Sequence, residues 1–142
     1  MTIRQAMCSS FKTELLRGIH DFTTSTGDTF KMALYSASAD LNDATTAYTT
    51  SGEITGTGYT AGGITLSQVT PALVGSTAVV TFATATWPAA TFSARGALIY
   101  NATESNRAVM VLDFGSVRSV SASTFTVAFP TADAYNAIIQ VA

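Results

Sequence analysis

The chain has 142 residues, a net charge of −2 at pH 7 and a hydrophobic content of 47%. This length is typical of one domain, and the hydrophobic content is high enough to build a packed core, which excludes a polar disordered chain. Charged residues make up only 11% of the sequence, against about 25% in an ordinary soluble domain. The seven Lys and Arg residues are scattered rather than clustered, so a nucleic-acid partner is not expected.

Thr, Ser, Ala and Gly take the place of the missing charges, as in the run SVSAST at 119–124. A neutral surface rich in hydroxyl groups suits a protein whose faces are covered by neighbours. A monomer of slightly unusual composition is the alternative interpretation.

Neither a membrane span nor an export signal is expected. The apolar runs, such as 108–112, are far shorter than the roughly 18 residues that a spanning helix needs, and no unbroken apolar stretch follows Arg4. Cys8 is the only cysteine, which excludes an intramolecular disulfide and a cysteine-based zinc site. We therefore expect the chain to be made and folded in a cytoplasm, where the glycosylation motif at 101–103 is accidental.

One short helix is predicted near residues 10–18. Ser9 and Ser10 offer an N-cap, and Gly18 stands where a C-terminal stop would fall. The apolar residues that recur at helical spacing are Phe11, Leu15, Leu16 and Ile19. Such a helix is marginal alone and must pack on something.

Most of the remaining sequence alternates with a period of two, which is typical of half-buried strands. The expected strands cover 29–35, 64–66, 78–82, 91–100, 107–113, 124–129 and 138–141. Arg95-Gly96 interrupts the fourth alternation and indicates a bulge. These patterns predict an all-β fold, an antiparallel β-sandwich of jelly-roll or immunoglobulin-like type with seven or eight strands and one short N-terminal helix. Residues 1–22 are expected to form an N-terminal arm with the helix, and residues 23–142 the sandwich domain.

A long irregular stretch runs from residue 36 to residue 63. Loops of this length in a compact domain are usually functional or disordered. An edge strand around 53–55 is a further interpretation. The glycines at 56–63 have the wrong spacing for a phosphate-binding loop, and turn formation explains them better.

The sequence favours no catalytic, cofactor-binding or metal site. His20 is the sole histidine and precedes Asp21, but no Gly-x-Ser-x-Gly elbow accompanies it. The acidic pairs Asp113/Asp133 and Glu53/Glu104 fit solvated loop acids better than a glycosidase pair, and the Asp40-x-Asn42-Asp43 run fits turn capping better than calcium binding. Among the aromatic residues, Trp87 beside Pro88 fits a packed corner better than a ligand platform.

Several stretches along the chain resemble a family of small structural proteins of tailed bacteriophages. They are 11–22 (FKTELLRGIHDF), 29–35 (TFKMALY), 56–63 (GTGYTAGG), 94–101 (ARGALIYN), 106–109 (NRAV) and 111–115 (VLDFG). The resemblance covers roughly residues 9–142. It implies a virion component and brings no catalytic or binding residues with it.

Within a virion, a capsid decoration (cement) protein on the outer surface of the head is the expected role. Such a protein is synthesised in the host cytoplasm, binds the major capsid protein and often forms a symmetric homodimer or homotrimer. Docking onto the shell is assigned to the N-terminal apolar residues Phe11, Leu15, Leu16 and Ile19. The contact with a sister subunit is assigned to the long loop, through Tyr48 and Tyr59. No cofactor, nucleic acid or membrane is expected as a partner.

Two alternatives stay open at this point. A tail or fibre-associated module would use exposed Tyr48, Tyr59 and Trp87 to recognise a host saccharide or protein. A small β-sandwich enzyme acting on glycans would need two carboxylates within about 5–10 Å in a cleft.

Overall fold

The computed structural model describes residues 2–133 and 135–142, and it contains two antiparallel β-sheets and one short helix, α1 (Ser9–Leu16). The larger sheet has the strand order β1 (Ala6–Met7), β7 (Arg107–Val127), β6 (Ala85–Asn101), β2 (Phe30–Tyr35) and β3 (Ile64–Thr65). The smaller sheet has the order β4 (Gln68–Val74), β5 (Thr77–Phe82) and β8 (Ile139–Val141). This confirms the prediction of an all-β, sandwich-like fold with one short helix.

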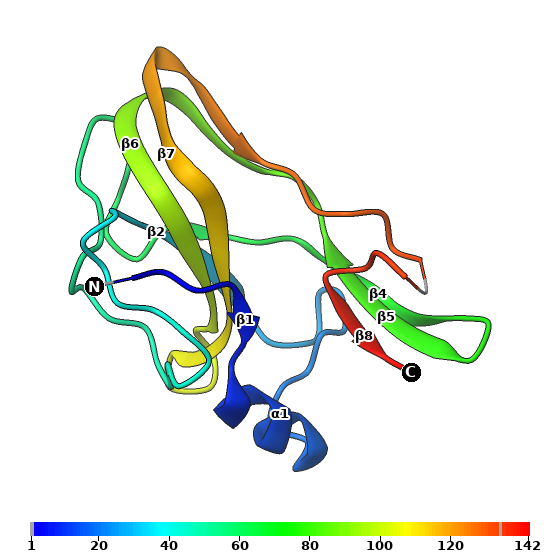
Figure 1. Ribbon diagram of the computed structural model, residues 1–142. Helices are drawn as coiled ribbons and strands as arrows, with labels where there is room; N and C mark the ends of the chain where they lie inside the picture. The colour runs from blue at the N-terminus through cyan, green and yellow to red at the C-terminus, as the bar shows by residue number, and fades with distance from the viewer. Residues whose placement is uncertain (1, 134) are drawn as a thin grey trace.

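A long hairpin of β6 and β7 forms the centre of the larger sheet. Near its closed end, Ala97 pairs with Leu112 on β7 and with Leu34 on β2, and all three side chains are buried. Away from that end the hairpin continues as a two-stranded ribbon, which arches over toward the smaller sheet (Figure 1). The strands predicted at 107–113 and 124–129 are therefore the two ends of one 21-residue strand.

The arch results from irregularities in the pairing of β6 with β7. The register shifts between Trp87 and Ala90 and again between Ala94 and Gly96, which confirms the predicted bulge at 95–96. Ala89 and Ala122 have positive φ values of 50° and 46°. Residues other than glycine rarely adopt this backbone conformation. The two alanines therefore mark the points where the ribbon turns.

The helix lies within two residues of its predicted position, which confirms that prediction. The predicted N-cap at Ser9 or Ser10 is wrong. Cys8 occupies the N-cap position without a side-chain hydrogen bond, and Ser9 and Ser10 form the first turn. Gly18, with a φ of 73°, lies just beyond the C-cap Arg17, where a left-handed residue commonly ends a helix.

The N-terminal residues do not form a separate arm. Ala6 pairs with Val111 of β7, and the amide N–H of Cys8 donates to the carbonyl of Val109 at 3.0 Å. The side chains of Ile3, Cys8 and Phe11 all belong to the buried core. Residues 2–22 are thus integrated into the larger sheet, because their apolar side chains complete the core that the strands begin.

The core continues from the larger sheet to the smaller one through a series of aromatic rings. Phe22 stacks on Phe30 with centroids 4.3 Å apart, and Phe30 meets Phe82 of β5 edge-on at 6.1 Å. Phe82 in turn contacts Phe129, at a centroid distance of 5.3 Å. These rings join the two sheets into one body.

Candidate functional sites and contact surfaces

The long 36–63 stretch is held against the larger sheet by a cluster around the carboxylate of Glu53. Tyr48 donates its hydroxyl to Oε1 at 2.6 Å, and Tyr59 donates to Oε2 at 2.5 Å. The amide of Gly62 adds a third hydrogen bond to Oε2, at 2.7 Å. Tyr100 of β6 stacks on Tyr48 with centroids 4.8 Å apart and donates its hydroxyl to the carbonyl of Gly62. Glu53 itself bridges to Tyr35 of β2 rather than forming the edge strand that was considered at 53–55.

Burial in this cluster raises the pKa of several phenol groups. The pKa of Tyr100 rises to about 12, and those of Tyr35, Tyr48 and Tyr59 rise further above their ordinary value. Desolvation is the main cause for all four, and the nearby Glu53 carboxylate adds to it because it disfavours a second negative charge. The phenols therefore stay protonated and act as hydrogen-bond donors.

The assignment of Tyr48 and Tyr59 to a contact with a sister subunit is not supported by their placement. Both side chains are half-buried, and both hydroxyl groups are bonded to Glu53 of the same chain. The sequence shows that the two tyrosines lie in a long loop, but it does not show that both donate a hydrogen bond to Glu53. Their role in the structure is to order the loop.

A second polar cluster connects α1 with the ends of β6 and β7. Arg107 donates to Glu14 Oε2 at 2.7 Å, and the other carboxylate oxygen of Glu14 lies 3.0 Å from His20 Nε2. On the other side of the ring, Asn101 Nδ2 lies 3.0 Å from His20 Nδ1 and donates to Asp28 Oδ2 at 2.7 Å. Burial alone would raise the pKa of Glu14, but the hydrogen bonds from His20 and Arg107 outweigh it and hold that pKa below its ordinary value.

The hydrogen bonds fix which nitrogen of His20 carries a proton. Asn101 Oδ1 accepts from the amides of Thr103 and Glu104, so its Nδ2 must face the ring and donate to Nδ1. In this arrangement Nδ1 accepts from Asn101, and Nε2 points at Glu14. Both nitrogens of His20 are engaged and the ring is buried, so the arrangement holds the chain together and leaves no free base for a nucleophile.

The remaining polar motifs also serve local structure. Asp113 accepts from Arg95 Nε at 3.0 Å, and this hydrogen bond lowers the pKa of the Asp113 carboxyl. Asp133 accepts from the backbone amides of Tyr135 and Asn136. Asn42 Oδ1 accepts from the amide of Ala44 at 2.8 Å, which confirms the predicted turn capping. Among the residues that the structure describes, no group of three or more His, Cys, Asp or Glu side chains is placed to hold a metal ion.

Trp87 is a packed residue, as the sequence favoured. Its side chain is only 1% exposed and meets the ring of Phe125 at 5.8 Å. Asn101 of the glycosylation motif is fully buried. Cys8 is buried as well, and desolvation raises the pKa of its thiol to about 11. In the described part of the chain, no helix has the length and apolar character needed to cross a membrane.

The predicted docking residues separate into different environments. Phe11 is fully buried, packs against His20 and Phe22, and therefore cannot contact a shell. Leu15 and Ile19 are half-buried. Leu16 is 91% exposed, so among these four residues it alone projects fully into solvent, and its docking role stays a prediction.

Leu16 stands at the rim of an apolar groove of about 570 Å³ between α1 and the smaller sheet. The residues on its two walls include Leu15, Leu16 and Phe22 on one side and Ala78, Val80 and Val141 on the other. We call this the lobe groove, and we call β4, β5 and β8 with their connecting turns the uncharged lobe. The inner face of the smaller sheet is thus covered only in part by the rest of the chain.

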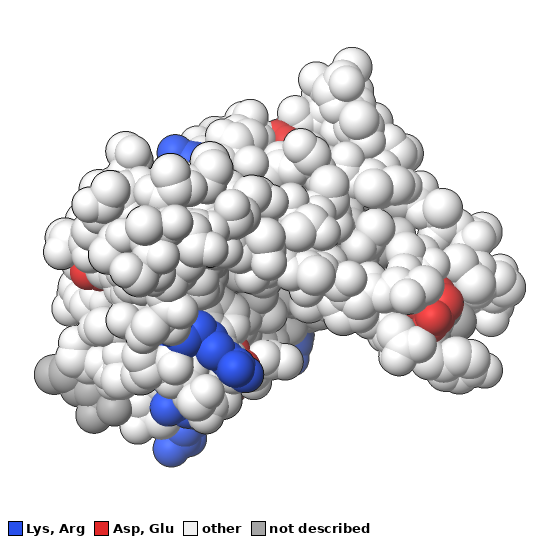
Figure 2. Space-filling view, turned by 90° about the horizontal axis from the view of Figure 1, so that it is seen from above, with Lys and Arg blue, Asp and Glu red and all other residues white. Residues whose placement is uncertain are grey.

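The uncharged lobe takes its name from the distribution of charged residues along the sequence. No charged residue or histidine lies between Glu53 and Arg95, and none follows Asp133. In Figure 2, most of the visible face is uncharged, and Lys and Arg gather on the side away from β4, β5 and β8. Among the residues that the structure describes, seven large hydrophobic residues are exposed. Five of them lie in α1 or on the lobe, namely Leu16, Val69, Leu73, Val74 and Val141.

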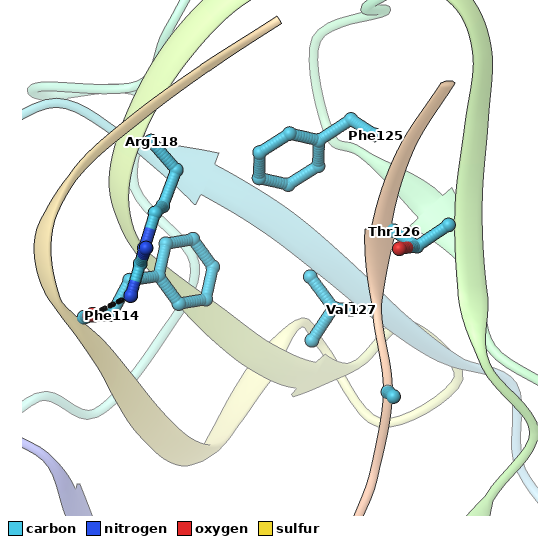
Figure 3. A pocket seen from close by; sticks show the side chains of 6 residues that line it. Phe114, Arg118, Phe125, Thr126 and Val127 are labelled. Carbon is cyan, nitrogen blue, oxygen red and sulfur yellow. Dashed lines mark hydrogen bonds between the residues drawn. The ribbon is translucent and has the colours of Figure 1, made fainter.

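A smaller hollow of about 350 Å³ lies on the arch of the β6–β7 ribbon (Figure 3). Phe114 and Phe125 face each other across it, with centroids 6.2 Å apart. Arg118 folds back so that its Nη2 donates to the carbonyl of Phe114 at 3.4 Å. Its walls all come from β7 and the residue after it, which makes it a feature of one strand rather than a cleft between elements.

We compared the chain with protein-family models, curated proteins and solved structures, and none of them matches it. The resemblance to tailed-phage structural proteins therefore stays an expectation from the sequence.

Proposed function

We propose that this chain is a non-enzymatic structural protein of a tailed-phage virion, a capsid decoration protein that binds the outer surface of the assembled head as a symmetric oligomer. The observation that carries the proposal is the uncharged lobe with its exposed apolar side chains. An apolar surface of this kind marks a site of contact with another protein. The order of the phage-like stretches along residues 9–142 adds the virion context.

The use of polar side chains supports a structural role. The carboxylate of Glu53, the ring of His20 and the carboxylate of Glu14 are all saturated by partners within the chain. Groups held in this way stabilise the fold and are poorly placed to exchange protons with a substrate. The molecule also leaves apolar side chains exposed at the lobe, and exposed apolar surface promotes association.

The placement of the aromatic residues favours the head over the tail alternative. Recognition of a host saccharide was assigned to Tyr48, Tyr59 and Trp87 on the assumption that they are exposed. Trp87 is buried, and the two tyrosines are bonded to Glu53. The aromatic rings that this alternative needs on the surface are therefore buried or half-buried.

The proposal is tested by adding the purified full chain to heads of the phage that encodes it, assembled without this protein. Co-sedimentation that saturates at a fixed stoichiometry per capsid protein is the expected result. The bound protein should also raise the temperature at which the heads release their DNA, because a ligand that binds only the intact shell stabilises it. Absence of saturable binding to heads, or binding to isolated tails only, contradicts the proposal.

A further inference from the structure

The lobe groove and the residues around it form a surface that the chain itself leaves open. Leu16 and Val141, on opposite sides of the groove, are 91% and 55% exposed, and Leu73 on β4 is 71% exposed. We propose that a second copy of this chain covers this surface, in a twofold dimer that places each Leu16 in the groove of its partner. In this dimer Leu16 contacts the sister subunit, and this contact replaces the docking onto the shell that was predicted for Leu16.

The distribution of charge favours a second copy over a different protein. Complementary charges usually steer and register the contact between unlike partners, and the uncharged lobe offers none. In a twofold interface the same patch meets itself, so like charges near the axis would repel. A patch with few charges keeps this repulsion small. Asp21 alone carries a formal charge among the described residues that line the groove, and its carboxylate accepts the amide of Thr23 at 2.9 Å.

The shape of the surface is also compatible with a contact between the same surface on two copies of the chain. A protruding side chain, Leu16, stands directly beside a hollow of about 570 Å³. A twofold axis passing between the two features brings the projection of each copy to the hollow of the other. The cavity is much larger than one leucine side chain, and it also offers room for apolar neighbours such as Leu15 and Val141 to come together.

Pairing of strand edges is a less favourable mode of association for this lobe. β4 is an edge strand of the smaller sheet, but Pro71 interrupts it and the register shifts between Val69 and Ala72. Proline lacks the amide donor that a new strand would need, and bulges disfavour edge pairing. At the β4 edge, association through side chains on the face of the sheet is therefore favoured over strand pairing, and the other edge strand, β8, has only three residues.

This inference deepens the proposed function, because it names the partner at the lobe, but it can be tested without phage particles. Sedimentation velocity and light scattering on the purified full chain, over a series of concentrations, measure the mass in solution. We expect a dimer for the native sequence. Leu16→Glu and Val141→Glu should each weaken the dimer by at least about tenfold in Kd, because a charge is placed in an apolar contact.

Val117→Glu is the matched control. Val117 lies on β7, outside the lobe, and is 53% exposed, nearly the same as Val141. This variant should remain dimeric, and circular dichroism should show the same fold for all three variants. A native chain that is monomeric at every concentration, a trimer, or a dimer that Leu16→Glu and Val141→Glu leave intact would overturn the inference. A native monomer that still saturates heads would overturn the dimer while leaving the binding to the head in place.

Discussion

Glu53 shows how one side chain can order a long segment. Its carboxylate accepts from Tyr48, Tyr59 and the amide of Gly62, and Tyr59 also accepts the amide of Leu34 of β2 at 3.0 Å. A loop of nearly thirty residues is thereby fastened to a sheet without regular strand pairing. The carboxylate is the one acceptor that all three donors share. Its loss would leave the three donors without this hydrogen-bond partner.

Replacing the Glu53 carboxylate by an amide should destabilise the fold. In Glu53→Gln, one oxygen becomes an amide donor that faces a hydroxyl donor. We expect the free energy of unfolding to fall by about 2 kcal/mol, measured by urea denaturation. Asp40→Asn is the control, since Asp40 is exposed and its change should stay within about 0.5 kcal/mol. Equal effects of the two substitutions would contradict the role assigned to Glu53.

The raised phenol pKa values predict a loss of stability in alkali. A phenol whose pKa is higher in the folded state binds its proton more tightly there. Its contribution is fully present below the unfolded pKa of about 10 and is lost as the pH rises toward the folded value, about 12 for Tyr100. The free energy of unfolding should therefore decline from about pH 10 upward, as guanidinium titrations at fixed pH values would show. Tyr135 is exposed and lies outside the cluster, so the test uses the variant Tyr135→Phe. In that variant, absorbance of tyrosinate should appear together with unfolding, and gradual ionisation of the folded protein would argue against the buried cluster.

At the scale of elements, the pairing of β2 with β3 depends on Gly63. This residue has a φ of 81°, and a Cβ atom there would lie 1.7 Å from the carbonyl oxygen of Met32 on β2. Gly75, in the turn between β4 and β5, also has a positive φ, 63°, but has open space around it. Both glycines have a positive φ, but only Gly63 lies close to a neighbouring strand.

This contrast gives a paired prediction for the two glycines. Gly63→Ala should lower the free energy of unfolding by at least about 2 kcal/mol, because strand β2 must move to admit the methyl group. Gly75→Ala should cost about 1 kcal/mol, the penalty for the backbone conformation alone. Thermal and urea unfolding followed by circular dichroism measures both. A loss at Gly75 as large as that at Gly63 would show that backbone strain, and not the close approach to Met32, sets the cost.

The integration of the N-terminal residues with the larger sheet gives a prediction about Phe11. Phe11→Ala removes a fully buried ring from the core and should cost about 3–5 kcal/mol. Leu16→Ala, on the same helix but exposed, should change the stability of the monomer by less than about 0.5 kcal/mol. Denaturation under conditions in which both variants are monomeric makes the comparison. A stable, native-like Phe11→Ala variant would contradict the integration of the N-terminal residues into the core.

Sequence patterns were sufficient to predict β2, β5, β8 and parts of β6 and β7, and to place the helix. Alternating apolar residues mark most of these segments, although β2 is buried at five of its six positions and not on one face alone. The arch of the ribbon was missed because its turning points are Ala89 and Ala122, which carry no glycine signal. The N-cap was misplaced because Cys8 occupies that position without a capping side chain.

The candidate sites depended more on tertiary structure. Nothing local indicates that Glu53 meets Tyr48 and Tyr59, since the loop must first fold back on β2. The hydrogen-bond partners of His20 come from α1 and β6, and Asn101 is 81 positions away. The lobe had one available signal, the absence of charge between Glu53 and Arg95.

At the scale of the whole molecule, charge and apolar exposure are separated. The polar networks fasten the helix and the long loop to the larger sheet, whereas the smaller sheet carries no charge and exposes several apolar side chains. Internal networks of this kind favour a rigid body, and an open apolar lobe is typical of a contact surface. Both features fit the role that we propose, a protein that covers a repeating shell.

The central claim is that this protein coats the phage head, and immunogold electron microscopy of purified particles tests it most directly. An antibody raised against the purified chain is applied to intact particles, and particles lacking the protein serve as the control. The account predicts gold spread evenly over the heads. Gold confined to the tail end, or no labelling of particles that contain the protein, would contradict it.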